Sequence, residues 1–143
     1  MIELSPDQLI KLFTRLQQLT TLPENDADHL QWEEKGGKVY SVHHGENTVF
    51  FLNTDRSYAG GNNLEFRILV KKKGKGVAVD EKEAQVNAKY EELVYQKIRR
   101  EVFFSHKLKN LAKTVNLLFK TIKLQVDISE IKQVAEINKQ LGL

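Results

Sequence analysis

Five basic residues follow one another in the middle of the chain with no acidic residue between them. Clustered cations attract polyanions, and lysines on a strand or on a glycine-containing loop can follow a phosphate backbone. The sequence therefore predicts a nucleic-acid contact at this run, although the same charges would also protect an edge strand from aggregation. The residues of the run are Arg67, Lys71, Lys72, Lys73 and Lys75.

Two aromatic residues, Tyr58 and Phe66, lie close to this basic run in the sequence. Aromatic rings bind single-stranded nucleic acid by stacking on the bases. Phe66 shares one face of its predicted strand with other apolar residues, so we expect it to be buried. Tyr58 falls in a predicted loop and is the expected stacking residue.

A second basic stretch lies further along the chain, where eight basic residues between positions 97 and 123 stand against Glu101 alone. On a helix these residues could lie along a nucleic acid, and arginine can bind phosphate bidentately, which lysine cannot. An anionic membrane surface, an acidic protein partner and a merely solvated helix face are the alternatives. The predicted contacts are Lys97, Arg99, Arg100, Lys107 and Lys113.

Histidine and acidic residues form no recognised metal-binding pattern. His43 and His44 are adjacent and would lie on opposite faces of a strand, so they cannot easily bind one ion together. Asp26, Asp28 and His29 could supply ligands from an acidic loop, but their spacing matches no metal motif. The chain has no cysteine, which excludes thiolate chemistry and cysteine-based zinc sites. We expect neither a metal nor a cofactor.

No motif specifies a reaction, so we expect a non-enzymatic protein with no catalytic residue. The five serines are scattered, and Ser5 and Ser129 are predicted helix caps. A Ser–His pair could still form in space, because such pairs need not be close in sequence. The glycine-containing segment 57–63 could hold an anion through its backbone N–H groups, but it lacks the Lys-Ser/Thr pair of a phosphate-binding loop.

Charge is divided unevenly along the 143 residues, of which 41% are apolar and 29% charged. These values are ordinary for a globular protein and exclude a disordered chain. The net charge of +3 combines −4 over residues 1–63 with +7 over residues 64–143. The N-terminal residues lack the apolar core of a signal peptide, and no uncharged apolar run reaches the roughly 18 residues of a membrane span. We expect a cytoplasmic protein, or one in the host-cell cytoplasm if it is viral or plasmid-encoded.

The first half of the chain predicts a helix followed by an antiparallel meander. Residues 6–20 have apolar residues at helical spacing after a capping box formed by Ser5 and Gln8. Gly45 and Glu46 are predicted to form a two-residue type II′ turn between two strands. Strands are predicted at residues 30–34, 38–44, 47–53 and 64–71, with a polar loop at 54–63. The turn implies the pairs His44 with Asn47, Val42 with Val49, Tyr40 with Phe51, and Val39 with Leu52.

The second half predicts helices, because apolar residues recur at helical spacing with no proline or glycine between Val77 and Gln140. Residues 77–79 are a candidate for a further short strand. Residues 80–122 should form one kinked helix or two helices that meet near Ser105. We expect a break at residues 124–127 and a last helix that begins at the capping box of Asp127 and Glu130 and stops at Gly142.

The predicted fold is therefore α+β, with an N-terminal helix, a four-stranded antiparallel meander sheet, and two or three C-terminal helices, one of them long or kinked. It should form one domain over residues 1–143, with helix 6–20, a sheet within 30–71 and a helical part over 80–141. The leading functional hypothesis is a non-enzymatic nucleic-acid-binding accessory protein. The alternative is a protein-interaction or assembly module that acts through the helices after residue 80, and a membrane-surface adaptor is a third hypothesis.

Overall fold

The computed structural model describes residues 2–36, 39–57, 61–72, 89–99 and 108–143. Within these ranges the chain forms two helices and a five-stranded sheet, which confirms the predicted α+β class. The elements in chain order are α1 (Pro6–Thr20), β1 (Glu33–Glu34), β2 (Val39–His44), β3 (Thr48–Ser57), β4 (Gly61–Lys71), β5 (Tyr90–Ile98) and α4 (Lys109–Gln140).

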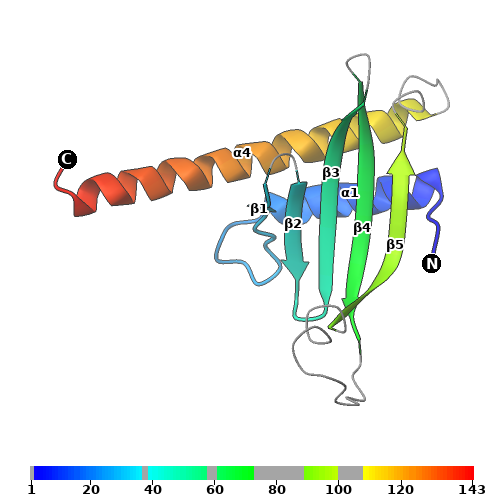
Figure 1. Cartoon of the computed structure of the whole chain (residues 1–143), viewed down its shortest axis with the longest axis horizontal. Coiled ribbons are helices and arrows are strands. Elements are labelled where there is room, and N and C mark those ends of the chain that lie inside the picture. The colour runs from blue at the N-terminus through cyan, green and yellow to red at the C-terminus, as the bar shows by residue number, and fades with distance from the viewer. Residues whose placement is uncertain (1, 37–38, 58–60, 73–88, 100–107) are drawn as a thin grey trace.

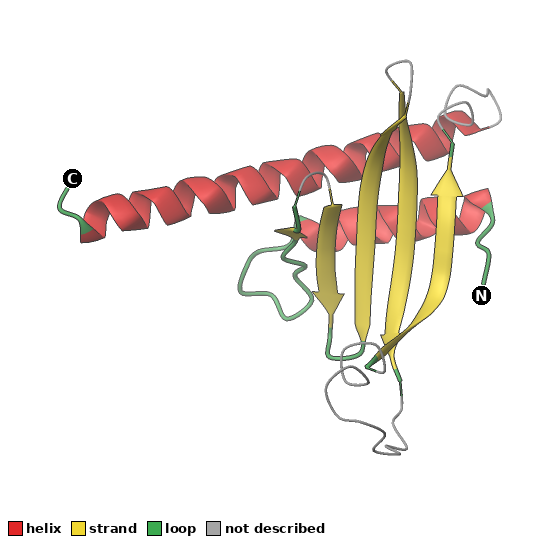
Figure 2. Ribbon diagram, in the orientation of Figure 1, coloured by secondary structure: helices red, strands yellow, loops and turns green. Residues whose placement is uncertain are grey.

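The strands form an antiparallel meander in which each strand pairs with its neighbour in the sequence, in the order β1-β2-β3-β4-β5. Both helices lie behind the sheet in Figure 1, and neither crosses its front face, as Figure 2 also shows. The molecule therefore has two layers. One face of the sheet contributes to the core, and neither helix covers the opposite face.

Helix α1 begins as the sequence predicts. The Ser5 hydroxyl accepts a hydrogen bond from the Gln8 N–H, and the Gln8 side chain accepts one from the Ser5 N–H. This capping box satisfies two backbone donors at the exposed helix start. The apolar face of α1 then buries Leu9, Phe13 and Leu16 against the sheet and α4.

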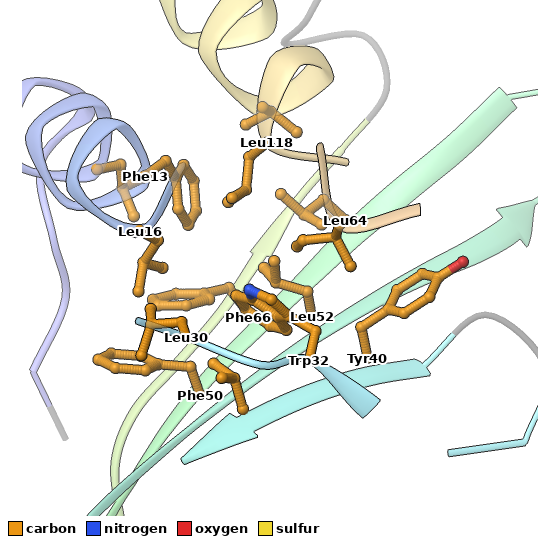
Figure 3. Close-up of a cluster of buried hydrophobic side chains, with 14 of the residues drawn as sticks. Phe13, Leu16, Leu30, Trp32, Tyr40, Phe50, Leu52, Leu64, Phe66 and Leu118 are labelled. Carbon is orange, nitrogen blue, oxygen red and sulfur yellow. The ribbon is translucent and has the colours of Figure 1, made fainter. Parts of the chain in front are cut away.

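The core fills the space between the helices and the inner face of the sheet (Figure 3). Phe13 of α1 meets Phe66 of β4 edge-to-face, with 5.0 Å between ring centroids, and neither side chain has any exposed surface. Aromatic pairs in this geometry add to the free energy gained by burial. Phe66 is thus buried, as predicted.

A hydrogen-bond network fixes the segment before β1 to both helices. The Trp32 indole N–H donates to the Thr20 hydroxyl at 2.9 Å, and the Trp32 backbone N–H donates to Gln125 Oε1 of α4 at 2.8 Å. Gln125 Nε2 donates in turn to the Leu30 carbonyl at 2.8 Å. Trp32 can therefore be 2% exposed with its polar atoms satisfied.

The hairpin between β2 and β3 has a different register from the predicted one. The structure pairs His44 with Thr48, not with Asn47, so the connection has three residues and Gly45 takes a φ of 62°. The one-residue shift turns β3 over, because side chains alternate between the two faces of a strand. The observed pairs that line the core are Val42 with Phe50 and Tyr40 with Leu52.

The sheet is also larger than predicted. Residues 90–98, predicted as helix, form strand β5, and the predicted polar loop at 54–63 is shortened because β3 reaches Ser57 and β4 begins at Gly61. The first strand is shorter than predicted and is limited to Glu33–Glu34. The candidate strand at 77–79 and the candidate junction at Ser105 lie outside the described residues.

The predicted break at residues 124–127 is absent, because α4 runs without interruption from Lys109 to Gln140. Asp127 and Glu130 therefore lie inside a helix and form no capping box. The helix ends where predicted, with Gly142 at a φ of 74°. Over the described ranges, no helix is both long enough and apolar enough to cross a membrane.

Candidate functional site

The open face of the sheet carries the basic residues that the structure places on β4 and β5. Side chains of β4 alternate, so Phe66 points into the core while Arg67 and Lys71 are exposed on the opposite face. On β5, Lys97 lies directly opposite Glu65 of β4 and is also exposed. The strand pairing thus brings together cations from both predicted basic stretches, which are far apart in the sequence.

Aromatic side chains flank the central cation of this face. Arg67 pairs with Phe51 of β3 on one side and with Tyr95 of β5 on the other. Its guanidinium lies 4.9 Å from the centroid of the Tyr95 ring, a cation–π contact. Tyr90 lies opposite Lys71 at one end of β4. The face therefore alternates positive charge with aromatic surface, which is typical of sites that bind single-stranded nucleic acid.

Acidic residues reduce the positive charge of this face but, among the described residues, form no ion pair with its cations. Glu65 lies opposite Lys97, and Glu92 lies opposite Leu69. In the part of the chain that the structure describes, the ion pairs are Lys35–Glu33 and Lys132–Glu24, and neither of them includes a residue of β4 or β5. The Arg67, Lys71 and Lys97 side chains therefore keep their charged groups available to an anion.

The cations form a track along the strands. Lys97 lies opposite Glu65, which is six residues before Lys71 on β4. Lys97 and Lys71 are therefore about 20 Å apart along the strand direction, from the rise per residue of a strand. Lys72 and Arg99 are exposed just beyond the ends of β4 and β5. The backbone around Lys72 is held in place, since its N–H donates to the Lys89 carbonyl at 3.0 Å.

The remaining predicted contacts do not join this track. Lys113 is exposed on α4, in the helix layer on the other side of the sheet. Lys113 therefore does not share a surface with the cations of β4 and β5. Five other predicted contacts, Tyr58, Lys73, Lys75, Arg100 and Lys107, lie outside the described residues.

Two aromatic residues of the site, Phe51 and Tyr95, were missed by the sequence argument. Tyr95 was assigned to a helix, and Phe51 was assigned to the other face of its strand by the incorrect register. The alternation of Val94, Gln96 and Ile98 with Tyr95 was the available signal, because period two predicts a strand whose second face is exposed.

No metal site or catalytic group emerges from the described part of the molecule. Within it, no group of three or more His, Asp or Glu side chains is close enough to hold an ion. An open pocket of about 330 Å³ lies between the end of α1 and the middle of α4, beside Leu22, His29 and Leu124. Its lining also includes the ion pair of Lys132 with Glu24, at 3.1 Å.

Tyr40 has a clearly perturbed pKa. Burial is the main cause that raises the pKa of its phenol, and the nearby carboxylates of Glu34, Asp127 and Glu130 raise it further. Each of these carboxylates disfavours the negative charge that the phenolate would carry. Tyr40 lies on the core side of β2, away from the open face, and has no role in the site.

A second exposed surface belongs to α4. Its buried residues end at Val126, and every residue from Glu130 to Leu143 is exposed. In Figure 1 this part of the helix extends beyond β1 and β2, past the end of the sheet. Its exposed apolar residues include Ile131, Val134 and Ile137, which is unusual for a surface that contacts only water.

Comparison with known proteins identifies no relative of the chain. Neither a protein-family model, nor a curated protein, nor a solved structure matches the chain.

Proposed function

We propose that the protein binds single-stranded nucleic acid on the open face of its sheet and has no catalytic activity of its own. The observation that carries this proposal is the row of Phe51, Arg67 and Tyr95 across three adjacent strands, with Lys71 and Lys97 on either side. The cations would contact phosphates, and the exposed tyrosine would stack on a base.

A single strand fits this surface better than a duplex does. Bases stack on an aromatic side chain only when their faces are accessible, as in unpaired strands. A sheet face is also broad and presents no element that could enter a groove of duplex DNA. Sequence-specific recognition is not part of the proposal, because charge and stacking are both tolerant of base identity.

The proposal is tested by the fluorescence anisotropy of a labelled single-stranded oligonucleotide titrated with the protein over a series of salt concentrations. Wild-type affinity should fall as salt rises, because bound phosphates release counterions. Replacing Arg67 and Lys97 together with alanine should weaken binding and reduce the salt slope by about 0.7 for each phosphate that is no longer neutralised. Tyr95→Leu should weaken binding by about 1–3 kcal/mol, because a leucine offers no ring on which a base can stack.

Lys113→Ala is the matched control, because it removes one exposed positive charge from the helix layer and leaves the sheet face intact. Its affinity should equal that of the wild type. Absence of binding at low salt would refute the proposed function. An equal loss of affinity in Lys113→Ala and in a single Arg67→Ala variant would mean that binding reflects overall charge and not this face.

A further inference from the structure

Helix α4 has two apolar rows on opposite sides. The inner row packs against the sheet and consists of Leu111, Val115, Leu118, Ile122 and Val126. Beyond Val126 the same line continues, at spacings of three and four residues, with polar residues only. These are Ser129, Gln133, Glu136 and Gln140. The apolar surface of the last part of α4 is therefore no continuation of the core row.

The outer row lies on the other side of the helix and points away from the sheet. Its members follow one another at intervals of seven, four, three and four residues, and the first four are 53%, 62%, 42% and 67% exposed. No described part of the chain covers them. The row consists of Leu117, Leu124, Ile128, Ile131 and Ala135.

These intervals are those of a coiled-coil heptad, in which positions a and d face a partner helix. Leu117, Leu124 and Ile131 take position d, and Ile128 and Ala135 take position a. The repeat runs from Leu117 to Leu141, about 36 Å at the rise of a helix. Asn138 is a polar residue at d, and Thr121 is one at a. The exposed residues Val134 and Leu141 occupy position g and widen the apolar stripe.

We propose that this surface binds a second copy of the chain through a parallel, in-register pair of α4 helices. Charge complementarity identifies the partner. In a parallel coiled coil, a residue at g faces the residue at e of the partner that lies five positions later. Asp127 occupies g and Lys132 occupies e, so each Asp127 would meet Lys132 of the other copy, twice by symmetry.

The same charges disfavour an antiparallel pair. In that orientation the e positions of the two helices face each other, and Lys132 and Lys139 of both copies would form one row of like charges. Lys132 contacts Glu24 at 3.1 Å within the chain, but both side chains are more than half exposed. An exposed ion pair of this kind contributes little free energy, so Lys132 is able to change its partner.

The outer row also remains accessible when the molecule is folded. Leu124 and Ile128 line one side of the open pocket beside the end of α1, and they are nevertheless 62% and 42% exposed. The sheet lies on the other side of α4. Two copies would therefore meet through their helix layers, with both open sheet faces directed outward. The pairing is independent of the proposed nucleic-acid binding.

The first experiment measures the mass of the full-length protein in solution by sedimentation equilibrium over a range of concentrations. The wild type should be a dimer that dissociates on dilution. Ile131→Asp places a charge in the interface and should raise the dissociation constant more than about tenfold. Gln133→Asp is the matched control, because it adds the same charge two residues further on, outside the outer row, and should leave the dimer intact.

The second experiment tests the orientation. Asp127→Lys and Lys132→Glu should each weaken the dimer, and the double variant should restore it. Because the chain has no cysteine, Asn138→Cys introduces a single thiol at a d position. In a parallel pair this thiol faces the same thiol of the other copy, and the two should form a disulfide-linked dimer under mild oxidation. Gln133→Cys should not form such a dimer.

Three results would overturn the inference. A wild type that is monomeric at every concentration would show that a second copy is not the partner. A dimer that Ile131→Asp leaves intact would place the interface elsewhere. A dimer whose Asn138→Cys variant fails to cross-link, and whose charge-swapped double variant is not restored, would exclude the parallel orientation. Circular dichroism of each variant confirms that the fold is retained, as expected for substitutions at exposed positions.

Discussion

At the scale of single residues, Tyr40 makes the stability of the protein depend on pH. Its pKa in the folded state is raised above the ordinary value of 10.0, mainly by burial. Below pH 10 the phenol is neutral in both states, so its contribution to stability is fully present. As pH rises above 10 the unfolded state ionises first, and the free energy of unfolding falls until the folded pKa is passed.

Tyr40→Phe should therefore flatten the fall in unfolding free energy above pH 10, by up to about 1.4 kcal/mol per pH unit, the value for one proton. Denaturant unfolding at a series of alkaline pH values measures this slope. Tyr95→Phe is the control, because Tyr95 is 36% exposed on the open face. If both variants change the slope equally, the effect belongs to tyrosine titration in general and not to the buried phenol.

The sequence was most informative about residues whose role is local. The capping pair of Ser5 and Gln8 and the burial of Phe66 were predicted, because each follows from neighbours a few positions away. The contact of Arg67 with Tyr95 was not predicted. It depends on the pairing of β4 with β5, and nothing in either segment alone specifies that register.

At the scale of elements, strand β5 shows why a spacing of four residues is ambiguous. Val94 and Ile98 are four positions apart, which fits one face of a helix and also one face of a strand, since four is a multiple of two. The sequence pattern was assigned to a helix. In the structure, residues 90–98 pair with the edge of β4 that does not pair with β3. This tertiary pairing outweighs the local helical pattern and makes the segment a strand.

Helix α4 was divided in the prediction for a related reason. The inner apolar row ends at Val126 and the outer row continues on the other side of the helix, so the phase of the pattern changes without a change in the backbone. The residues Asp127 to Glu130 have the pattern of a capping box and were interpreted as the start of a new helix after a break at residues 124–127. The same pattern can occur inside a continuous helix, as it does in α4.

The division of α4 into two parts predicts unequal effects of truncation. A chain that ends after Glu130 loses only exposed residues and the ion pair of Lys132 with Glu24. The free energy of unfolding of the monomer should change by no more than about 1 kcal/mol. Leu118→Ala removes most of a side chain that is 1% exposed and should lower the free energy of unfolding by about 2–5 kcal/mol.

Urea unfolding at a protein concentration low enough to keep the chain monomeric measures both values. A large loss of stability in the truncated chain would mean that the last part of α4 packs against its own sheet. That result would also contradict the exposure of its apolar residues.

At the scale of the whole molecule, the two proposed surfaces should respond differently to salt. Phosphate contacts on the sheet face are electrostatic and weaken as ionic strength rises. Pairing through Leu124, Ile128 and Ile131 is driven mainly by burial of apolar surface, which salt does not screen. Anisotropy and sedimentation measurements over the same salt series should therefore show loss of the oligonucleotide and retention of the dimer.

A variant of one surface should keep the activity of the other, so oligonucleotide binding and dimer formation can be separated. Ile131→Asp should bind an oligonucleotide as a monomer, and the double alanine variant of Arg67 and Lys97 should still form dimers. Loss of both activities in either variant would show that the two surfaces are coupled, contrary to their positions on opposite layers of the molecule.

The meander has a consequence for the order in which the protein folds during synthesis. Strands β1 to β5 pair only with neighbours in the sequence, so the sheet is built from local hairpins. Helix α1 comes from the start of the chain, yet it packs beside α4 at the far end. In a chain that emerges from the ribosome, the aromatic side chains of the core would therefore stay partly exposed until residues 109–126 are synthesised. Chaperones bind exposed apolar surface, so we expect them to bind the chain mainly in this interval.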